Sequence, residues 1–380
     1  MKKWIFILLI SIIQISAYAQ LAKRARDYKL KIGVMPTGKL NGITDVEGVK
    51  VGHITLNIGD TVHTGVTAIL PHGDNIFQEK VPAAIFAANG FGKLTGTTQI
   101  IELGNIETPI ILTNTLSVAA GIEGLLDYTL NYKGNESIKS VNAVVGETND
   151  SYLNDIRGRH VTKQHVLEAI ESAHSGQVEE GNVGAGTGTV CFGYKGGIGT
   201  SSRKLPKNLG GYTVGVLVQS NFGGVLQIDG VPIGAELGKF SFSNQLLNNV
   251  DGSCMVVIAT DAPLDSRNLE RLAKRAFLGL GKTGGIASNG SGDYMIAFST
   301  AKDLRTPHTS KTTMLKNSTL HNDETSPLFM AAIEATEEAI INSLFAAKTM
   351  TGITGNKVNA LPLDQVLPLL KKFNRIINEQ

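Results

Sequence analysis

Short apolar runs separated by polar turns recur along the chain and predict a protein with many strands. Each run is rich in β-branched and other apolar residues and is bounded by turn residues, which is typical of a buried strand. The clearest runs lie at residues 66–70, 83–87, 109–113, 141–145, 212–218, 255–259 and 294–299.

Longer segments carry apolar residues every three or four positions and predict amphipathic helices. They lie at residues 117–131, 161–172, 266–280, 327–348 and 363–377. Many strands combined with a few long helices favour a layered α/β or α+β protein. The polar, poorly periodic stretch 306–325 predicts a surface loop. Within the glycine-rich stretch 181–199, residues 184–188 predict a loop beside a site.

The N-terminus has the pattern of a secretory signal peptide. Lys2 and Lys3 are basic, residues 4–15 are apolar, and Ala17-Tyr18-Ala19 supplies an A-x-A cleavage site before Gln20. The apolar part is too short to favour a stable membrane span, although a retained anchor is the alternative. We therefore expect residues 1–19 to be removed and the mature protein to be periplasmic or secreted.

Charge and composition argue against a nucleic-acid partner. The whole chain has a formal net charge of +2, and removing Lys2 and Lys3 with the signal leaves 0. No basic stripe of the kind that binds nucleic acid runs through the mature sequence. One local basic patch, which we interpret as a solvated N-terminal arm, consists of Lys23, Arg24, Arg26 and Lys29.

The cysteines and histidines do not form a metal-binding pattern. Cys191 and Cys254 are the only cysteines, and whether they pair stays open because two cysteines do not make a disulfide framework. The histidines show no H-E-x-x-H or similar spacing. We therefore expect no metal site.

One junction between a turn and a strand suggests chemistry. Ser253 follows the polar turn 248–252 and stands just before the apolar run 255–259. Gly252 gives the backbone before the serine unusual freedom, which suits a serine that attacks its own upstream peptide bond. A hairpin turn feeding a core strand explains the same residues. No G-x-S-x-G elbow is present, and spacing leaves a Ser-His-Asp triad open.

Six further motifs occur in an order that resembles the L-aminopeptidase D-Ala-esterase/amidase family, which includes the β-peptidyl aminopeptidases. They lie at residues 45–53, 89–93, 146–150, 181–188, 219–223 and 289–293. The likeness covers most of the mature chain. It implies an α/β fold with four layers, an α/β/β/α sandwich, in a single catalytic domain at residues 20–380 that needs no cofactor.

The resemblance also implies that the chain cleaves itself between Gly252 and Ser253. The products would be an α chain of residues 20–252 and a β chain of residues 253–380, with Ser253 as an N-terminal nucleophile. An α-amino group has an ordinary pKa of roughly 7.7–8.0, close to working pH. Cleavage would thus place nucleophile and base on one residue, which explains why no histidine stands out.

Further site residues follow from the resemblance. Asn221 matches the oxyanion-hole asparagine of the family, although a turn asparagine is an alternative interpretation. Ser291 and Asp293 match a serine and an acidic residue expected to orient Ser253 and stabilise its protonated amine. Some relatives have glutamate where this chain has the shorter Asp293.

Glu147 and Tyr152 lie in a stretch that lines the substrate site in relatives. The resemblance implies that both bind substrate, and the chain departs from many relatives in having Ser151 where they have glycine.

The implied activity is release of an N-terminal amino acid from a small peptide, amide or ester through a Ser253 acyl-enzyme. Whether the released residue is L-α, D-α or β is left open. The resemblance implies a homo-oligomer of αβ units. Two alternatives are an acyltransferase resembling ornithine acetyltransferase, in which a threonine nucleophile is expected, and a secreted binding protein that stays uncleaved.

Overall fold

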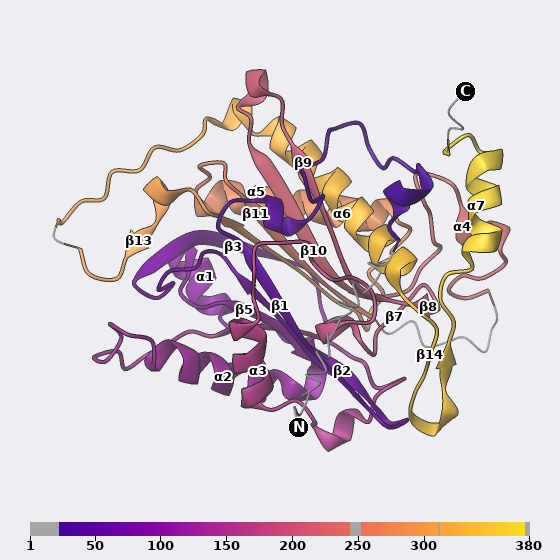
Figure 1. The fold of residues 1–380 in the computed structure, drawn as a ribbon. Helices are drawn as coiled ribbons and strands as arrows, with labels where there is room; N and C mark the ends of the chain where they lie inside the picture. The colour runs from indigo at the N-terminus through magenta and orange to yellow at the C-terminus, as the bar shows by residue number, and fades with distance from the viewer. Residues whose placement is uncertain (1–22, 244–251, 311, 377–380) are drawn as a thin grey trace, which may run out of the picture.

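A computed structural model describes residues 23–243, 252–310 and 312–376. The predicted signal at 1–19 and the turn residues 248–251 therefore lie outside the described residues. The described chain forms two stacked β-sheets with helices on the two outer faces (Figure 1).

The smaller sheet has the strand order β1-β2-β5-β6. Its strands are β1 (Lys50–Ile58), β2 (Val62–Leu70), β5 (Ile110–Asn114) and β6 (Val144–Thr148). The strand β2 is antiparallel to both β1 and β5, and β6 is parallel to β5. The strand predicted at 141–145 starts later, because the Asn142 backbone N–H donates to the Glu107 carboxylate instead of to a neighbouring strand.

The larger sheet has the order β13-β3-β12-β11-β10-β9, with β4 paired to β3. Its strands are β13 (Thr306–Pro307), β3 (Glu79–Gly90), β12 (Gly292–Ser299), β11 (Ser253–Thr260), β10 (Thr213–Asn221), β9 (Gly197–Lys204) and β4 (Asn105–Ile106). The strand β11 is parallel to β12 and antiparallel to β10. It therefore lies in the middle of the sheet, and Ser253 is its first residue.

Alternate residues of β11 face two different hydrophobic cores, as the two-residue period of a strand requires. Met255 and Val257 pack between the two sheets, in the same cluster as Leu112 of β5. Cys254 and Val256 pack on the other face, toward the helices. Ser253 lies two residues before Met255, so it faces the space between the sheets.

Two pairs of helices complete the layers. The helices α2 (Val118–Leu130) and α3 (Lys163–Glu171) pack on the smaller sheet, while α5 (Ser266–Lys282) and α6 (Ser326–Ala346) cover the larger one (Figure 1). The predicted four-layer α/β/β/α sandwich is thus confirmed.

The interpretation of the N-terminal basic patch as a solvated arm was wrong for Arg24 and Arg26, whereas Lys23 and Lys29 are exposed. The Arg24 and Arg26 guanidinium groups form ion pairs with the carboxylates of Glu180 and Glu338, at 2.6 and 2.7 Å. Arg203 of β9 is fully buried and also pairs with Glu338, at 2.8 Å. Charge pairing therefore explains why α6 buries acidic residues.

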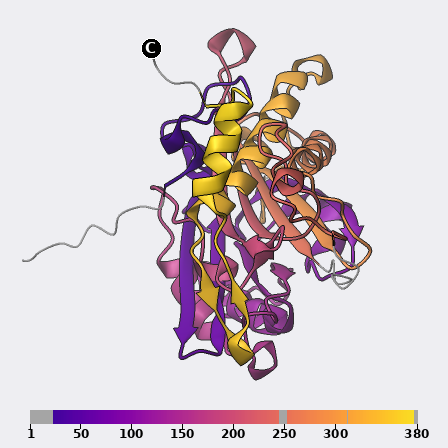
Figure 2. The same cartoon turned by 90° about the vertical axis from the view of Figure 1, so that its right-hand side faces the viewer.

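The remaining elements lie around the sandwich. They are the helices α1 (Thr97–Leu103), α4 (Ile233–Glu236) and α7 (Leu363–Lys372), and the hairpins β7–β8 (Val190–Cys191, Tyr194–Lys195) and β14–β15 (Met350–Thr351, Lys357–Val358). Figure 2 shows α7 and the β14–β15 hairpin together on one side of the molecule. The helix predicted at 363–377 ends at Lys372, and Asn374 takes a left-handed conformation with φ 56°. Among the described residues, no helix has the length and apolar character needed to cross a membrane.

Candidate active site

Ser253 lies at the edge of the space between the sheets, where β10 ends and β11 begins. Its side chain is buried, and its hydroxyl donates a hydrogen bond of 2.6 Å to the carbonyl oxygen of Gly252. The Gly292 backbone N–H donates to the same oxygen at 3.2 Å. The serine hydroxyl thus lies against the carbonyl group of its own upstream peptide bond, and that carbonyl is polarised from a second side.

Gly252 is in close contact with the strand beside it. A Cβ atom added to Gly252 would lie 2.7 Å from the Phe222 Cα atom and 2.9 Å from the Asn221 carbonyl oxygen. Real Cβ atoms do not approach backbone this closely, so only glycine allows the Gly252–Ser253 bond to lie at this position.

Asn221 is the last residue of β10 and is paired with Ser253 across the two strands. Paired residues of neighbouring antiparallel strands point to the same face, with Cβ atoms about 4.5–5.5 Å apart. The Asn221 Oδ1 atom accepts from the Val190 N–H at 2.9 Å, and its Nδ2 atom donates to the Asn149 carbonyl at 3.0 Å. An amide nitrogen carries two hydrogens, so one donor remains for a ligand beside Ser253.

Ser291 and Asp293 flank Gly292, which pairs with Ser253 from the other side. Both side chains are buried, and the Ser291 hydroxyl and the Cys254 N–H lie close enough to the Asp293 carboxylate to lower its pKa, although within the described residues none of these contacts has the geometry of a full hydrogen bond. Burial raises the pKa of Asp293 to about 6. Among the described residues of the intact chain, neither side chain hydrogen-bonds to Ser253, and Asp293, which pairs with Cys254, lies on the face of the sheet opposite to the Ser253 side chain.

Glu147, in β6, is brought close to this strand end. Its carboxylate accepts from the Lys93 N–H at 2.9 Å and from the Thr115 hydroxyl, and it pairs with the Lys93 ammonium at 3.7 Å. A Cβ atom on Gly92 would lie 3.1 Å from the Glu147 carboxylate and 3.4 Å from the Gly292 Cα atom. Gly92 and the Tyr294 ring thus lie between Glu147 and Gly292, the strand residue that pairs with Ser253.

Tyr152 lies in the turn after β6 and is 54% exposed. Its backbone carbonyl accepts from the Asn356 amide at 2.9 Å. In the described part of the chain, no hydrogen bond or ring contact joins the Tyr152 ring to Ser253 or Asn221, so its predicted role in substrate binding stays a prediction.

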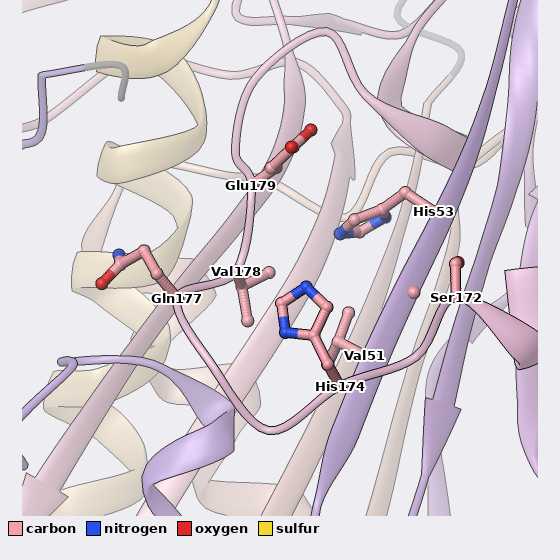
Figure 3. A pocket seen from close by; sticks show the side chains of 8 residues that line it. Val51, His53, Ser172, His174, Gln177, Val178 and Glu179 are labelled. Carbon is pink, nitrogen blue, oxygen red and sulfur yellow. The ribbon is translucent and has the colours of Figure 1, made fainter. Parts of the chain in front are cut away.

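Cys254 lies on the side of β11 opposite to the Ser253 side chain, and Cys191 lies in the β7–β8 hairpin. Cys191 and Cys254 are both buried and unpaired. Across the described residues, no group of three or more His, Cys, Asp or Glu side chains is arranged to hold a metal ion. A cavity of about 150 Å³ lies between the start of β1 and the segment after α3, with His53 and His174 in its wall (Figure 3). None of its lining residues belongs to the site around Ser253.

Comparison with known proteins shows the family. The model of peptidase family S58 matches residues 41–358. The chain belongs to peptidase family S58.

Individual relatives of this S58 peptidase agree with that assignment. It is 42% identical to a β-peptidyl aminopeptidase of Sphingosinicella microcystinivorans over 374 residues, which cover 93% of each chain. Its structure resembles that of a protein of Pyrococcus horikoshii OT3, with 51% identity, a TM-score of 0.85 and coverage of 92% of this chain and 99% of that one. It also resembles the L-aminopeptidase D-Ala-esterase/amidase of Ochrobactrum anthropi, described as a serine aminopeptidase with a variant of the Ntn hydrolase fold. That match has 35% identity, a TM-score of 0.86 and coverage of 93% and 99%.

These relatives confirm the predicted family, fold class and aminopeptidase function of the S58 peptidase. They give no support to the acyltransferase or to the binding protein. Cleavage at Gly252, export, oligomer formation and the roles of the site residues stay predictions.

Two groups that shape the site were not expected from the sequence. The Val190 N–H donates to the Asn221 side chain, and the Gly292 N–H donates to the Gly252 carbonyl. Every residue except proline has a backbone N–H, so the sequence does not reveal which of these groups act in a site. Val190 follows the glycine-rich segment 184–188, whose predicted position as a loop beside a site stays a prediction.

The buried Asp293 carboxyl of the S58 peptidase gives a stability prediction. Its folded pKa of about 6 lies above the ordinary value of about 3.9, so the folded state binds more protons and loses stability as pH rises between these values. In an uncleaved Ser253→Ala background, Asp293→Asn should remove this loss and raise the free energy of unfolding at pH 7 by up to about 3 kcal/mol. Urea unfolding from pH 4 to pH 8 measures it, and equal pH slopes with and without Asp293 would refute it.

Proposed function

We propose that the S58 peptidase cleaves its own Gly252–Ser253 bond and then works as a serine aminopeptidase with Ser253 as N-terminal nucleophile. The observation that carries this proposal is the pair of hydrogen bonds on the Gly252 carbonyl oxygen, from the Ser253 hydroxyl at 2.6 Å and from the Gly292 N–H at 3.2 Å. Nucleophile and polarised carbonyl are thus adjacent before any cleavage occurs.

Self-cleavage would proceed as an acyl shift followed by hydrolysis. The Ser253 Oγ atom bonds to the Gly252 carbonyl carbon, the bond from that carbon to the Ser253 nitrogen breaks, and the hydroxyl proton ends on the nitrogen. Water then hydrolyses the ester and leaves a carboxylate on Gly252 and an α-amino group on Ser253. The Gly292 N–H lies where negative charge develops on the Gly252 oxygen, as an oxyanion donor must.

The new α-amino group would then act as the base for peptide hydrolysis. With an ordinary pKa of roughly 7.7–8.0 it can take the proton of its own hydroxyl near neutral pH. Ser253 attacks the carbonyl of the substrate's N-terminal residue, and the remaining Asn221 N–H stabilises the oxyanion. The proton passes to the leaving amine, and water resolves the acyl-enzyme.

Asp293 and Ser291 would receive the new N-terminus. Their unpartnered, buried oxygens are acceptors that an ammonium group could satisfy. A buried carboxylate without a partner is costly in the intact chain and is stabilised once an opposite charge is created beside it.

Glu147 is proposed to bind the substrate's free amino group, because an aminopeptidase has to recognise that ammonium. A hydrogen bond to a charged group is worth about 1.5–3 kcal/mol, so Glu147→Gln should lower kcat/KM roughly 10- to 150-fold. The matched control is Glu107→Gln, since Glu107 is also buried and pairs with a lysine, Lys80, at 3.5 Å. Equal losses in both variants would contradict the role of Glu147.

The released residue is proposed to include β-amino acids. The support is the 42% identity to a β-peptidyl aminopeptidase over 93% of each chain. A panel of L-, D- and β-aminoacyl amides measures the preference, and failure to hydrolyse any β-aminoacyl amide would contradict this part of the proposal.

Export after Ala19 and assembly into an oligomer of αβ units are proposed on the sequence pattern and on the resemblance. Expression of the full chain should give a mature protein that starts at Gln20, and light scattering should give a mass several times that of one αβ unit. A protein that still starts at residue 1 would contradict export, and the mass of a single αβ unit would contradict assembly into an oligomer.

Gel electrophoresis under denaturing conditions tests the proposed function. The purified mature protein should resolve into two polypeptides and should hydrolyse an aminoacyl amide without an added acyl acceptor. A single intact polypeptide in an active preparation would contradict self-processing, and product formation that requires an amine acceptor would favour a transferase.

A further inference from the structure

The Asn221 carboxamide is held at both ends by segments that are distant in the sequence. Val190 contacts its oxygen from the β7–β8 hairpin, and Asn149 contacts its nitrogen from the turn after β6. The direction of the remaining N–H toward Ser253 therefore depends on how firmly these two segments are fixed.

Lys195 fixes the first segment. It is fully buried, and its ammonium donates to the Gly186 carbonyl at 3.0 Å and to the Gly196 carbonyl at 2.8 Å. Gly186 lies four residues before Val190, and Gly196 in turn donates its N–H to the Thr189 carbonyl at 3.1 Å. The lysine thus ties together both ends of the chain segment that presents the Val190 N–H.

Asp150 fixes the second segment. It directly follows Asn149 and is buried, and its Oδ1 atom accepts from the Asn154 amide at 2.9 Å. The Asn154 Oδ1 atom accepts from the His63 N–H of β2 at 3.0 Å. Asp150 thus anchors this turn to β2 of the smaller sheet, and the turn in its place presents the Asn149 carbonyl to Asn221.

The two segments touch, and their anchors carry opposite charges. A Cβ atom on Gly188 would lie 2.9 Å from the Asp150 Cβ atom. Burial lowers the pKa of Lys195 to about 7, and the negative charge of Asp150 opposes that shift. No direct ion pair joins the two side chains within the described residues. A buried lysine is costly unless an opposite charge and hydrogen bonds compensate it.

We propose that Lys195 and Asp150 are positioning residues for Asn221, one anchoring the segment that holds its carboxamide oxygen and the other anchoring the segment that holds its nitrogen. This inference rests on the proposed oxyanion role of Asn221. It assigns a function in catalysis to two buried charges that touch neither Ser253 nor substrate.

The test compares Lys195→Met with the double variant Lys195→Met/Asp150→Asn. The single variant leaves an uncompensated buried carboxyl and should lower the melting temperature. The double variant removes both charges at similar volume, which is often neutral for stability, so its melting temperature should return toward wild type. The kcat of the double variant should remain roughly 10- to 100-fold below the wild-type kcat, and its KM should stay within about twofold of the wild-type KM. The reason is that displacing a catalytic group by about 1 Å slows the reaction without weakening substrate binding.

The matched control is Lys239→Met, since the Lys239 ammonium also donates to a carbonyl of the same hairpin, that of Gly193, at 2.6 Å. It should keep wild-type kcat. A folded double variant that fails to cleave itself would also overturn the proposal, because self-cleavage depends on the Ser253 hydroxyl and the Gly292 N–H and not on the Asn221 carboxamide. Recovery of kcat together with the melting temperature would show a purely structural role and overturn the proposal, as would wild-type kcat in Lys195→Met.

Asn221→Ala separates this inference from the proposed function. If that variant keeps full kcat, the oxyanion role fails. If it loses kcat while the folded double variant does not, Asn221 is catalytic but Lys195 and Asp150 do not position it.

Discussion

Ser253→Ala should remain one polypeptide after signal removal and should lose aminopeptidase turnover by roughly 10⁴- to 10⁶-fold. The reason is that the same hydroxyl serves both reactions. It lies 2.6 Å from the oxygen of its own upstream carbonyl, and alanine has no atom to attack that carbonyl or to form an acyl-enzyme. Denaturing electrophoresis and initial rates on an aminoacyl amide measure the two effects together.

The control for Ser253→Ala is Cys254→Ala. Cys254 is the next residue of β11, equally buried, and it faces the helix-covered core instead of the space between the sheets. Its substitution perturbs packing on the same strand without touching the nucleophile, so cleavage and turnover should persist. If Ser253→Ala still gave two polypeptides with a new N-terminus at residue 253, another group would be cleaving the bond and Ser253 would not be the nucleophile.

Asn221→Ala should lower kcat about 10²- to 10³-fold, the usual cost of removing one oxyanion donor, with little change in KM. The donor that is lost acts on charge that develops only in the transition state, so ground-state binding is spared. Steady-state kinetics on the fraction of enzyme that has been cleaved gives kcat and KM separately.

Asn342→Ala is the matched control for Asn221→Ala. The Asn342 side chain is buried and also bridges two backbone groups, accepting from the Ala25 N–H at 3.1 Å and donating to the Thr200 carbonyl at 3.0 Å. The two variants therefore lose similar hydrogen bonds and similar stability, but only one loses a donor beside Ser253. Equal kcat in both would contradict the oxyanion role of Asn221.

Most of the secondary structure could be predicted from apolar patterns, and the exceptions have physical causes. The strand β9 was missed because glycine, threonine and serine fill much of it, and its buried Arg203 is satisfied by carboxylates of α6 that no local pattern reveals. The helix α1 was missed because it has only seven residues, begins with two threonines, and is flanked by Gly96 and Gly104. The pairing and layering of the sheets came from the family resemblance.

The site could be predicted only in part. A serine between a turn and a strand marks Ser253, and the resemblance adds Asn221, but their pairing across β10 and β11 depends on a register that only the fold sets. Lys195 and Asp150 carry charges that usually indicate solvent exposure. They are buried against the segments that hold the Asn221 carboxamide, where three parts of the chain meet, and no local sequence pattern contains such a meeting.

The intact mass of the active enzyme tests self-processing most directly. Mass spectrometry of purified wild-type protein that hydrolyses an aminoacyl amide should show two polypeptides, one ending at Gly252 and the other starting at Ser253 with a free α-amino group. A single mass for residues 20–380, or a break at any other bond, in a preparation with full activity would contradict Ser253 as an N-terminal nucleophile.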